Sequence, residues 1–157
     1  MLTPRNLKSW CLVMGRLDAG VQFTYKGLKL ELVDNFRYLG VIFSRSCSFD
    51  LCVDTLTKSG QKAMMAMLNR AHLLGGLDID LKCRLFDILV APILMYGCEV
   101  WGTKRHDSLE KTLLKFCKLV LGVPSSATTN AVLGELGRFP LWISTQFRAV
   151  QYWSGAL

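Results

Sequence analysis

The chain has 157 residues, of which 51% are hydrophobic and 20% are charged, so its composition excludes a disordered chain and suits one compact domain or a small domain with an appendage. The formal net charge of +7 makes a polyanion a plausible partner, although charge alone does not define a fold. A mean hydropathy of +0.29 is high for a soluble domain and indicates that some apolar surface lies against a missing partner or a missing part of the same protein.

The first 46 residues have the pattern of β-strands and turns. Residues 10–14 form a short β-rich run, and residues 21–25 and 28–32 alternate apolar and polar around Lys26-Gly27, which predicts a hairpin. Residues 36–43 (FRYLGVIF) predict a third strand, in which Gly40 marks a bulge or a close approach by another backbone or a ligand. Residues 1–46 are therefore expected to form a three-stranded antiparallel sheet that needs a cover.

Residues 47–157 are expected to form a mostly helical domain, which makes the chain an α+β protein. A helix is predicted from Asp50, or from a cap at Ser48, to about Leu74, where Gly75 and Gly76 end it. Further helices are predicted from Asp107 to Gly122, from Asn130 to Gly137 and from Pro140 to Trp153. Glu110, three residues after Asp107, predicts a capping box at the start of the first of these.

The most apolar stretch runs from Leu81 to Gly102 and predicts a central core helix. No side chain is charged between Ile88 and Cys98, and a helix that is apolar all round is buried. The charge-free run is shorter than the roughly 20 residues that span a bilayer. Pro92 predicts a kink or a break between two shorter helices. Asp78 and Asp80, which precede this segment, are interpreted as helix caps rather than metal ligands.

The six cysteines and two histidines show no pattern of metal ligands. No two cysteines form a C-x-x-C pair, and His72 and His106 are remote in sequence, so we expect no metal site. Cys83, Cys98 and Cys117 fall on predicted apolar helices, where a free thiol acts as a small hydrophobic group. Reduced thiols and the lack of a secretory pattern predict an intracellular protein, nuclear or cytoplasmic.

Several segments now follow one another in a recognisable order, although each alone is a weak motif. They are the predicted hairpin at Phe23–Leu32, FRYLGVIF at 36–43, KSGQKA at Lys58–Ala63, APILMYGCEVWG at Ala91–Gly102, KFCKLVLGVP at Lys115–Pro124, TTNAVLGELGRFPL at Thr128–Leu141, and a last helix that bears a tryptophan. This order resembles the C-terminal part of the reverse transcriptase of non-LTR (LINE-type) retrotransposons. The resemblance implies that residues 1–46 close a polymerase palm and that residues 47–157 form a thumb-like domain.

The same resemblance places the catalytic machinery outside this chain. The family's aromatic-x-Asp-Asp turn and third carboxylate hold two metal ions, and no Asp-Asp pair occurs here. The parent would be an RNA-directed DNA polymerase that uses Mg²⁺, whereas this chain alone is expected to be inactive and to bind no cofactor. Its expected partners are an RNA/DNA template–primer duplex and the missing palm and fingers of the same polyprotein, with no membrane partner.

Two groups of residues are candidate contacts with that duplex. Residues that match the position of the primer grip are Phe36, Arg37, Tyr38, Leu39 and Gly40. Residues that could track a phosphate backbone are Lys58, Lys62, Arg70, Lys104, Arg105, Lys111, Lys115 and Lys118. The alternatives are a buried strand with a bulge for the first group and a solvated helix face for the second. For the whole chain, the alternative is a helical protein-interaction module or a non-functional remnant with incidental positive charge.

Overall fold

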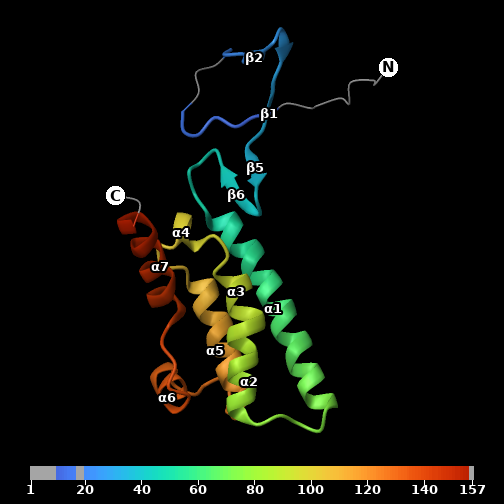
Figure 1. Cartoon of the computed structure of the whole chain (residues 1–157), viewed down its shortest axis with the longest axis vertical. Coiled ribbons are helices and arrows are strands. Elements are labelled where there is room, and N and C mark those ends of the chain that lie inside the picture. The colour runs from blue at the N-terminus through green and yellow to red at the C-terminus, as the bar shows by residue number, and fades with distance from the viewer. Residues whose placement is uncertain (1–9, 17–19, 156–157) are drawn as a thin grey trace. The chain divides into compact units, whose positions relative to one another are not determined.

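The structure is a computed structural model that describes residues 10–16 and 20–155 (Figure 1). The chain divides into two compact units, Met1–Cys52 and Val53–Leu157. The first unit contains small sheets and the second is helical, so the α+β class is confirmed. The division between a palm part and a thumb part, which we expect between residues 46 and 47, stays a prediction. Within the described residues, no helix combines the length and the apolar character that crossing a membrane requires.

The described strands of the first unit are short and form three separate pairs rather than one three-stranded sheet. The parallel pair joins β1 (Trp10–Cys11) to β4 (Glu31–Leu32). The antiparallel pair of β2 (Thr24–Tyr25) and β3 (Leu28–Lys29) turns at Lys26 and Gly27, which have φ values of 50° and 75°. The predicted hairpin is thus confirmed with shorter strands, and the predicted three-stranded sheet is not confirmed.

The third predicted strand, residues 36–43, is in fact a hairpin. β5 (Asn35–Tyr38) pairs antiparallel with β6 (Val41–Ser44), and Tyr38 lies opposite Val41. Leu39 and Gly40 form the two-residue turn with φ values of 46° and 87°. Positive φ at both positions is the geometry that matches the twist of paired strands, and glycine adopts it without steric cost. The prediction of one continuous strand was wrong because Leu39 is not a typical turn residue.

The long helix α1 (Asp50–Leu73) begins and ends where the sequence predicted, to within one residue. The Ser48 hydroxyl accepts a hydrogen bond from the Asp50 amide at 3.1 Å, and Gly75 and Gly76, both with φ of 86°, end the helix. A Cβ atom on Gly60 would lie 2.3 Å from Leu94 Cδ2. The absence of a side chain at Gly60 therefore lets α1 approach the Leu94 side chain closely.

The segment from Ile79 to Trp101 is a broken series of short helices rather than one core helix. α2 (Ile79–Leu85) runs into a π-helical turn, η1 (Phe86–Val90), and then into α3 (Ala91–Leu94) and α4 (Cys98–Trp101). The Asp78 carboxylate caps α2 by accepting from the Leu81 amide at 3.1 Å, as predicted.

Two features explain where this series breaks. The π-type bond from the Ala91 amide to the Phe86 carbonyl lies directly before Pro92, which has no N–H to continue an α-helical pattern. The chain then reverses at Gly97, with φ of 66°. The prediction that this segment is buried on all sides was wrong, because the side chains of Ile88 and Leu89 are 69% and 48% exposed.

The remaining helices are α5 (Asp107–Leu121), α6 (Thr129–Glu135) and α7 (Leu141–Gly155). They enclose the core of the second unit, whose largest fully buried side chains include Phe86, Leu94, Trp101, Leu113 and Phe116. Figure 1 shows α5 in the middle of this unit, with α1 and the α2–α3 series beside it.

The close approach of α4 to α7 depends on one glycine, which gives a test of the packing. A Cβ atom on Gly102 would lie 2.4 Å from the Cys98 carbonyl oxygen and 2.7 Å from the Thr145 carbonyl oxygen. Because these are backbone atoms, Gly102→Ala should destabilise the protein by about 1–3 kcal/mol in urea unfolding. The control Gly134→Ala, in α6 where nothing lies within 4 Å, should stabilise it by about 0.5–1 kcal/mol. Equal effects of the two substitutions would contradict this packing.

Candidate nucleic-acid interface

Three of the predicted lysines share a narrow face of α5. At roughly 100° per residue, Lys111, Lys115 and Lys118 fall within an arc of about 60°. The opposite face carries the buried Leu113 and Phe116, so packing holds the lysine face toward solvent. The three lysines line an open groove of about 380 Å³ together with Leu114, Leu119, Val123 and Ser125.

Of these lysines, Lys118 has a defined partner within the groove. Its ammonium group donates a hydrogen bond of 2.5 Å to the Ser125 carbonyl oxygen. This bond joins α5 to the loop that follows Gly122 and keeps that loop at the groove. Lys111 and Lys115 are exposed, so they are the better placed to meet an anion.

A polar seam joins α5 to α1 and relates the two predicted groups of basic residues. The Thr57 hydroxyl donates to the Ser108 hydroxyl at 3.4 Å, and the Gln61 amide donates to the Thr112 hydroxyl at 3.1 Å. On α5, Lys115 lies about 60° around the helix from Thr112, on the side away from the core.

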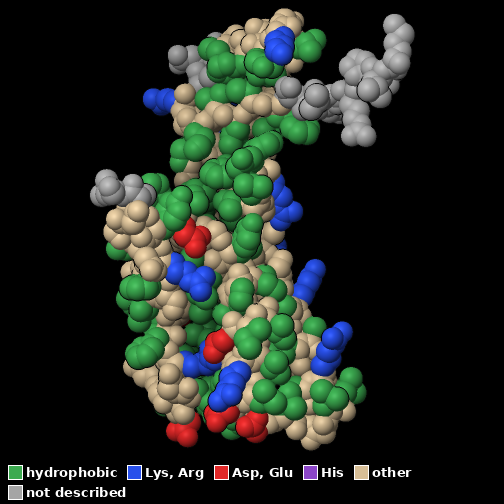
Figure 2. All heavy atoms as spheres, in the orientation of Figure 1, with side chains coloured by type: hydrophobic (Ala, Val, Ile, Leu, Met, Phe, Trp, Pro, Cys, Tyr) green, Lys and Arg blue, Asp and Glu red, His purple; other side chains and the backbone are tan. Residues whose placement is uncertain are grey.

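On α1 the arrangement is similar. Lys58 lies about 60° and Lys62 about 100° around the helix from Gln61, on the solvent side of the seam. Figure 2 shows basic side chains along the outer edge of α1 in this unit. Lys58 and Lys62 therefore flank the same seam as Lys111 and Lys115.

The structure does not bring every predicted cation to this seam. Arg70 lies about 180° around α1 from Gln61, which places it on another face. Lys104 and Arg105 precede α5, and Arg105 forms an exposed ion pair with Asp107 at 3.3 Å. The basic surface with geometric support thus comprises Lys58, Lys62, Lys111, Lys115 and Lys118, defined here as the seam lysines.

An aromatic and cationic cluster fixes α5 on its buried side. The Phe116 ring stacks on Phe86 with centroids 4.2 Å apart, and the Arg138 guanidinium lies 5.3 Å from the Phe86 centroid and 5.6 Å from that of Phe116. Arg138 also forms two hydrogen bonds of 2.9 Å to the Asp87 carboxylate and one of 2.9 Å to the Cys83 carbonyl. Burial alone would lower the pKa of Arg138, but hydrogen bonding and charge from Asp87 raise it overall.

Glu110 joins α5 to α7, which corrects the predicted capping box. Its carboxylate accepts from the backbone amides of Leu141 at 3.2 Å and Trp142 at 2.7 Å. These amides open α7 and need acceptors, so Glu110 caps a helix distant in sequence rather than its own. Desolvation by burial raises the pKa of Glu110, and the two backbone hydrogen bonds oppose that rise.

The predicted primer-grip residues lie in the β5–β6 hairpin of the first unit. Phe36 is half-buried, whereas Arg37, Tyr38, Leu39 and Gly40 are exposed. Their role as a primer grip stays a prediction.

Among the described residues, no group of His, Cys, Asp and Glu side chains could hold a metal ion. Burial raises the pKa of the Cys117 thiol to about 11, so this thiol stays protonated.

Sequence analysis missed Arg138 and the apolar floor of the groove, and it assigned Glu110 to a local capping box rather than to the start of α7. Arg138 lay within the motif of residues 128–141 but had no periodic partner, since Asp87 is far away in sequence. Leu119 follows Lys118 directly, and this leucine beside the lysine face was the one available signal in the sequence of an apolar element beside the charges.

Comparison with known proteins confirms the resemblance that the motif order predicted: the chain is similar to non-LTR retrotransposon RNA-directed DNA polymerases, at modest identity. The RNA-directed DNA polymerase from mobile element jockey of Drosophila funebris is 28% identical over 116 residues, which cover 72% of this chain and 13% of the relative.

A second relative gives a longer match. A 115 kDa protein of the type-1 retrotransposable element R1DM of Drosophila melanogaster is 26% identical over 151 residues, which cover 90% of this chain and 14% of the relative. The chain thus spans about a seventh of the length of these relatives. No family model and no solved structure matches it.

The raised pKa of Glu110 predicts a pH-dependent contribution to stability. Ionisation of Glu110 opposes folding, so its contribution is full below the ordinary pKa of 4.5 and is lost as pH rises through the higher pKa of the folded state. Glu110→Gln removes the ionisation but keeps one acceptor oxygen. The free energy of unfolding of the wild type, relative to Glu110→Gln, should therefore fall between pH 4 and pH 7 in urea titrations, by roughly 1.4 kcal/mol for each unit by which the pKa is raised. A difference that is constant with pH would contradict this assignment.

Proposed function

We propose that this chain is part of a retrotransposon reverse transcriptase and that its seam lysines contact the sugar-phosphate backbone of a template–primer duplex. The observation that carries the proposal is the convergence of two lysine groups, on α1 and α5, beside one hydrogen-bonded seam. Relatives that include an RNA-directed DNA polymerase support the choice of nucleic acid over other polyanions. We propose that the chain holds the duplex and does not take part in catalysis. The catalytic carboxylates that hold Mg²⁺ in the parent polymerase are expected to lie outside this chain.

The geometry suits phosphate contacts rather than base recognition. Lysine ammonium groups act as point charges toward phosphates and carry no sequence information. Lys111 and Lys118 are seven residues apart, which is about 10 Å along a helix axis. Such a row can meet successive phosphates of one strand. The proposed binding is thus independent of sequence and strongly dependent on salt.

We also propose that the missing palm and fingers of the same polyprotein cover part of the apolar surface. On α7, Ile143, Phe147 and Val150 recur at spacings of four and three and are 41%, 66% and 64% exposed. An apolar stripe on the outside of a helix is a typical contact for another folded part. The same stripe also favours the second candidate function, a helical protein-interaction module.

Substituting two seam lysines tests the proposed function. In Lys111→Gln with Lys115→Gln, binding of an RNA–DNA hybrid should weaken at every sequence, and the slope of log K against log salt should fall by about two, one for each lost phosphate contact. Fluorescence anisotropy over a salt series measures both quantities. The same change at Lys58 and Lys62 should have a similar effect if both helices contact the duplex.

The matched control carries the same change of charge elsewhere in the second unit. Lys82→Gln with Arg84→Gln removes two positive charges from α2, outside the groove. This control should leave the salt slope nearly unchanged. Equal losses in both double variants would mean that only net charge matters, and the absence of any steep salt dependence in the wild type would favour the protein-interaction module.

A further inference from the structure

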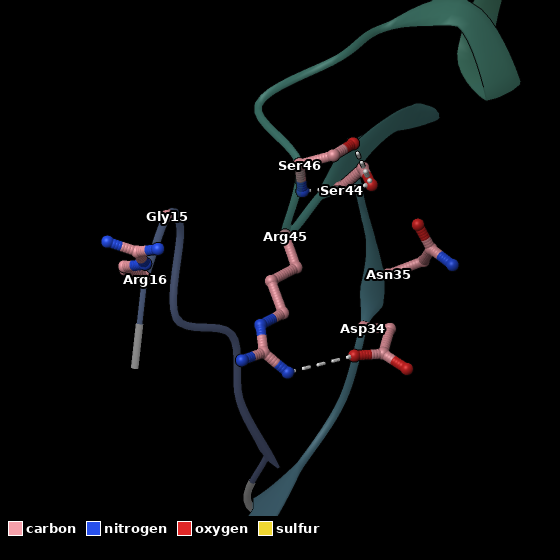
Figure 3. Close-up of a pocket in the computed structure, with 7 residues that line it drawn as sticks. All are labelled: Gly15, Arg16, Asp34, Asn35, Ser44, Arg45 and Ser46. Carbon is pink, nitrogen blue, oxygen red and sulfur yellow. Dashed lines mark hydrogen bonds and ion pairs between the residues drawn. The ribbon is translucent and has the colours of Figure 1, made fainter. Parts of the chain in front are cut away.

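An open pocket in the first unit gathers two arginines that sequence analysis did not select. Its volume is about 510 Å³, and it is lined by Gly15, Arg16, Asp34, Asn35, Ser44, Arg45 and Ser46 (Figure 3). The lining residues come from three segments: the chain after β1, the start of β5, and the end of β6 with the turn that follows it.

Backbone hydrogen bonds hold these three segments together. The Gly15 amide donates to the Arg45 carbonyl at 2.9 Å, and the Arg45 amide donates to the Asp34 carbonyl at 2.8 Å. The Val33 amide donates to the Cys11 carbonyl at 3.1 Å, which extends the parallel pairing of β1 with β4. The pocket is thus set by the backbone, so changes to its exposed side chains should leave the fold intact.

The charge in the pocket is positive and accessible. Figure 3 shows Arg45 extending between the segment of Gly15 and that of Asp34, with its guanidinium directed toward Asp34. This ion pair is long, 3.7 Å, and its side chains are 48% and 81% exposed, so water screens it strongly. Arg16 forms no ion pair with any described residue, so the described lining of the pocket carries two guanidinium groups and one carboxylate.

Hydroxyl groups complete the set of donors. The Ser44 and Ser46 hydroxyls lie 3.0 Å apart, and the Ser46 amide donates to the Ser44 hydroxyl at 3.4 Å. Guanidinium forks with nearby hydroxyls are the donors that suit a tetrahedral oxyanion such as a phosphate. Because the pocket is open, it suits a phosphate that belongs to a larger molecule.

We propose that this pocket binds one backbone phosphate of a nucleic acid, as a contact made by the first unit. The proposal rests on the proposed function, because it takes nucleic acid as the ligand, but it concerns different residues in the other unit. Asp34 would then lower the affinity, since its carboxylate opposes the phosphate, and its removal should tighten binding.

Paired variants with matched controls test the pocket in the full chain. Arg16→Gln with Arg45→Gln should weaken binding of an RNA–DNA hybrid by about 5-fold and lower the salt slope by about one. Lys26→Gln with Lys29→Gln, in the same unit but outside the pocket, should leave the slope unchanged. Asp34→Asn should tighten binding by about 2-fold, whereas Glu31→Gln, the same change of charge on β4, should not.

The outcomes separate this inference from the proposed function. If the wild type binds the hybrid, and the variant of Lys111 and Lys115 weakens binding while that of Arg16 and Arg45 does not, the pocket proposal alone fails. If Arg16→Gln with Arg45→Gln weakens binding of the hybrid no more than the control Lys26→Gln with Lys29→Gln, the pocket proposal also fails. If the wild type shows no salt-dependent binding, both proposals fail.

A titration with inorganic phosphate distinguishes a backbone phosphate from a free one. The amide resonance of Ser46 should shift only weakly with inorganic phosphate, and the RNA–DNA hybrid should shift it at far lower concentration. Tight, saturable binding of inorganic phosphate that the hybrid does not displace would assign the pocket to a free phosphate and overturn the proposal.

Discussion

The stack of Phe116 on Phe86, with Arg138 against both rings, is the constraint on which the second unit depends. Arg138 is only 14% exposed at its side chain, and a cation at that depth needs a partner. Asp87 supplies two hydrogen bonds and the Cys83 carbonyl a third. This one side chain thereby joins the segment between α6 and α7 to α2 and η1, while its planar face covers the aromatic rings.

The same cluster determines which way α5 faces. Phe116 and Leu113 are fully buried, and Glu110 binds the first amides of α7, so rotation of α5 would break aromatic, apolar and hydrogen-bonded contacts together. The lysines on the opposite side are then held outward by the core, and among them Lys118 also donates a hydrogen bond to the Ser125 carbonyl. Lys111 and Lys115 are thus exposed because the core fixes the orientation of α5.

Local signals predicted where several of the helices begin and end. Gly75 and Gly76 end α1, Gly122 ends α5, and Asp78 caps α2, because these are effects of single residues on the backbone near them. The lysine face could be predicted as a face, since helical periodicity relates residues three and four apart.

Pairings across the chain could not be predicted in this way. Glu110 had the spacing of a local cap, yet it binds amides that are more than 30 residues away, and nothing in a single sequence marks that choice. FRYLGVIF had the composition of one strand, but Gly40 made a turn more favourable than a bulge. The pocket of Arg16 and Arg45 depends on a parallel pairing between β1 and β4 that no periodicity indicates.

The apolar floor of the groove beside α5 decides how strongly its lysines can act. Leu114, Leu119 and Val123 line the same open groove as the three lysines of α5, so apolar atoms lie beside the ammonium groups. Charges attract more strongly where apolar atoms lower the local dielectric constant, and lysine stems lie well along such surfaces. A solvated helix face with the same three lysines would gain less from each contact. The combination of charge with an apolar floor therefore distinguishes this groove from a basic surface without apolar lining.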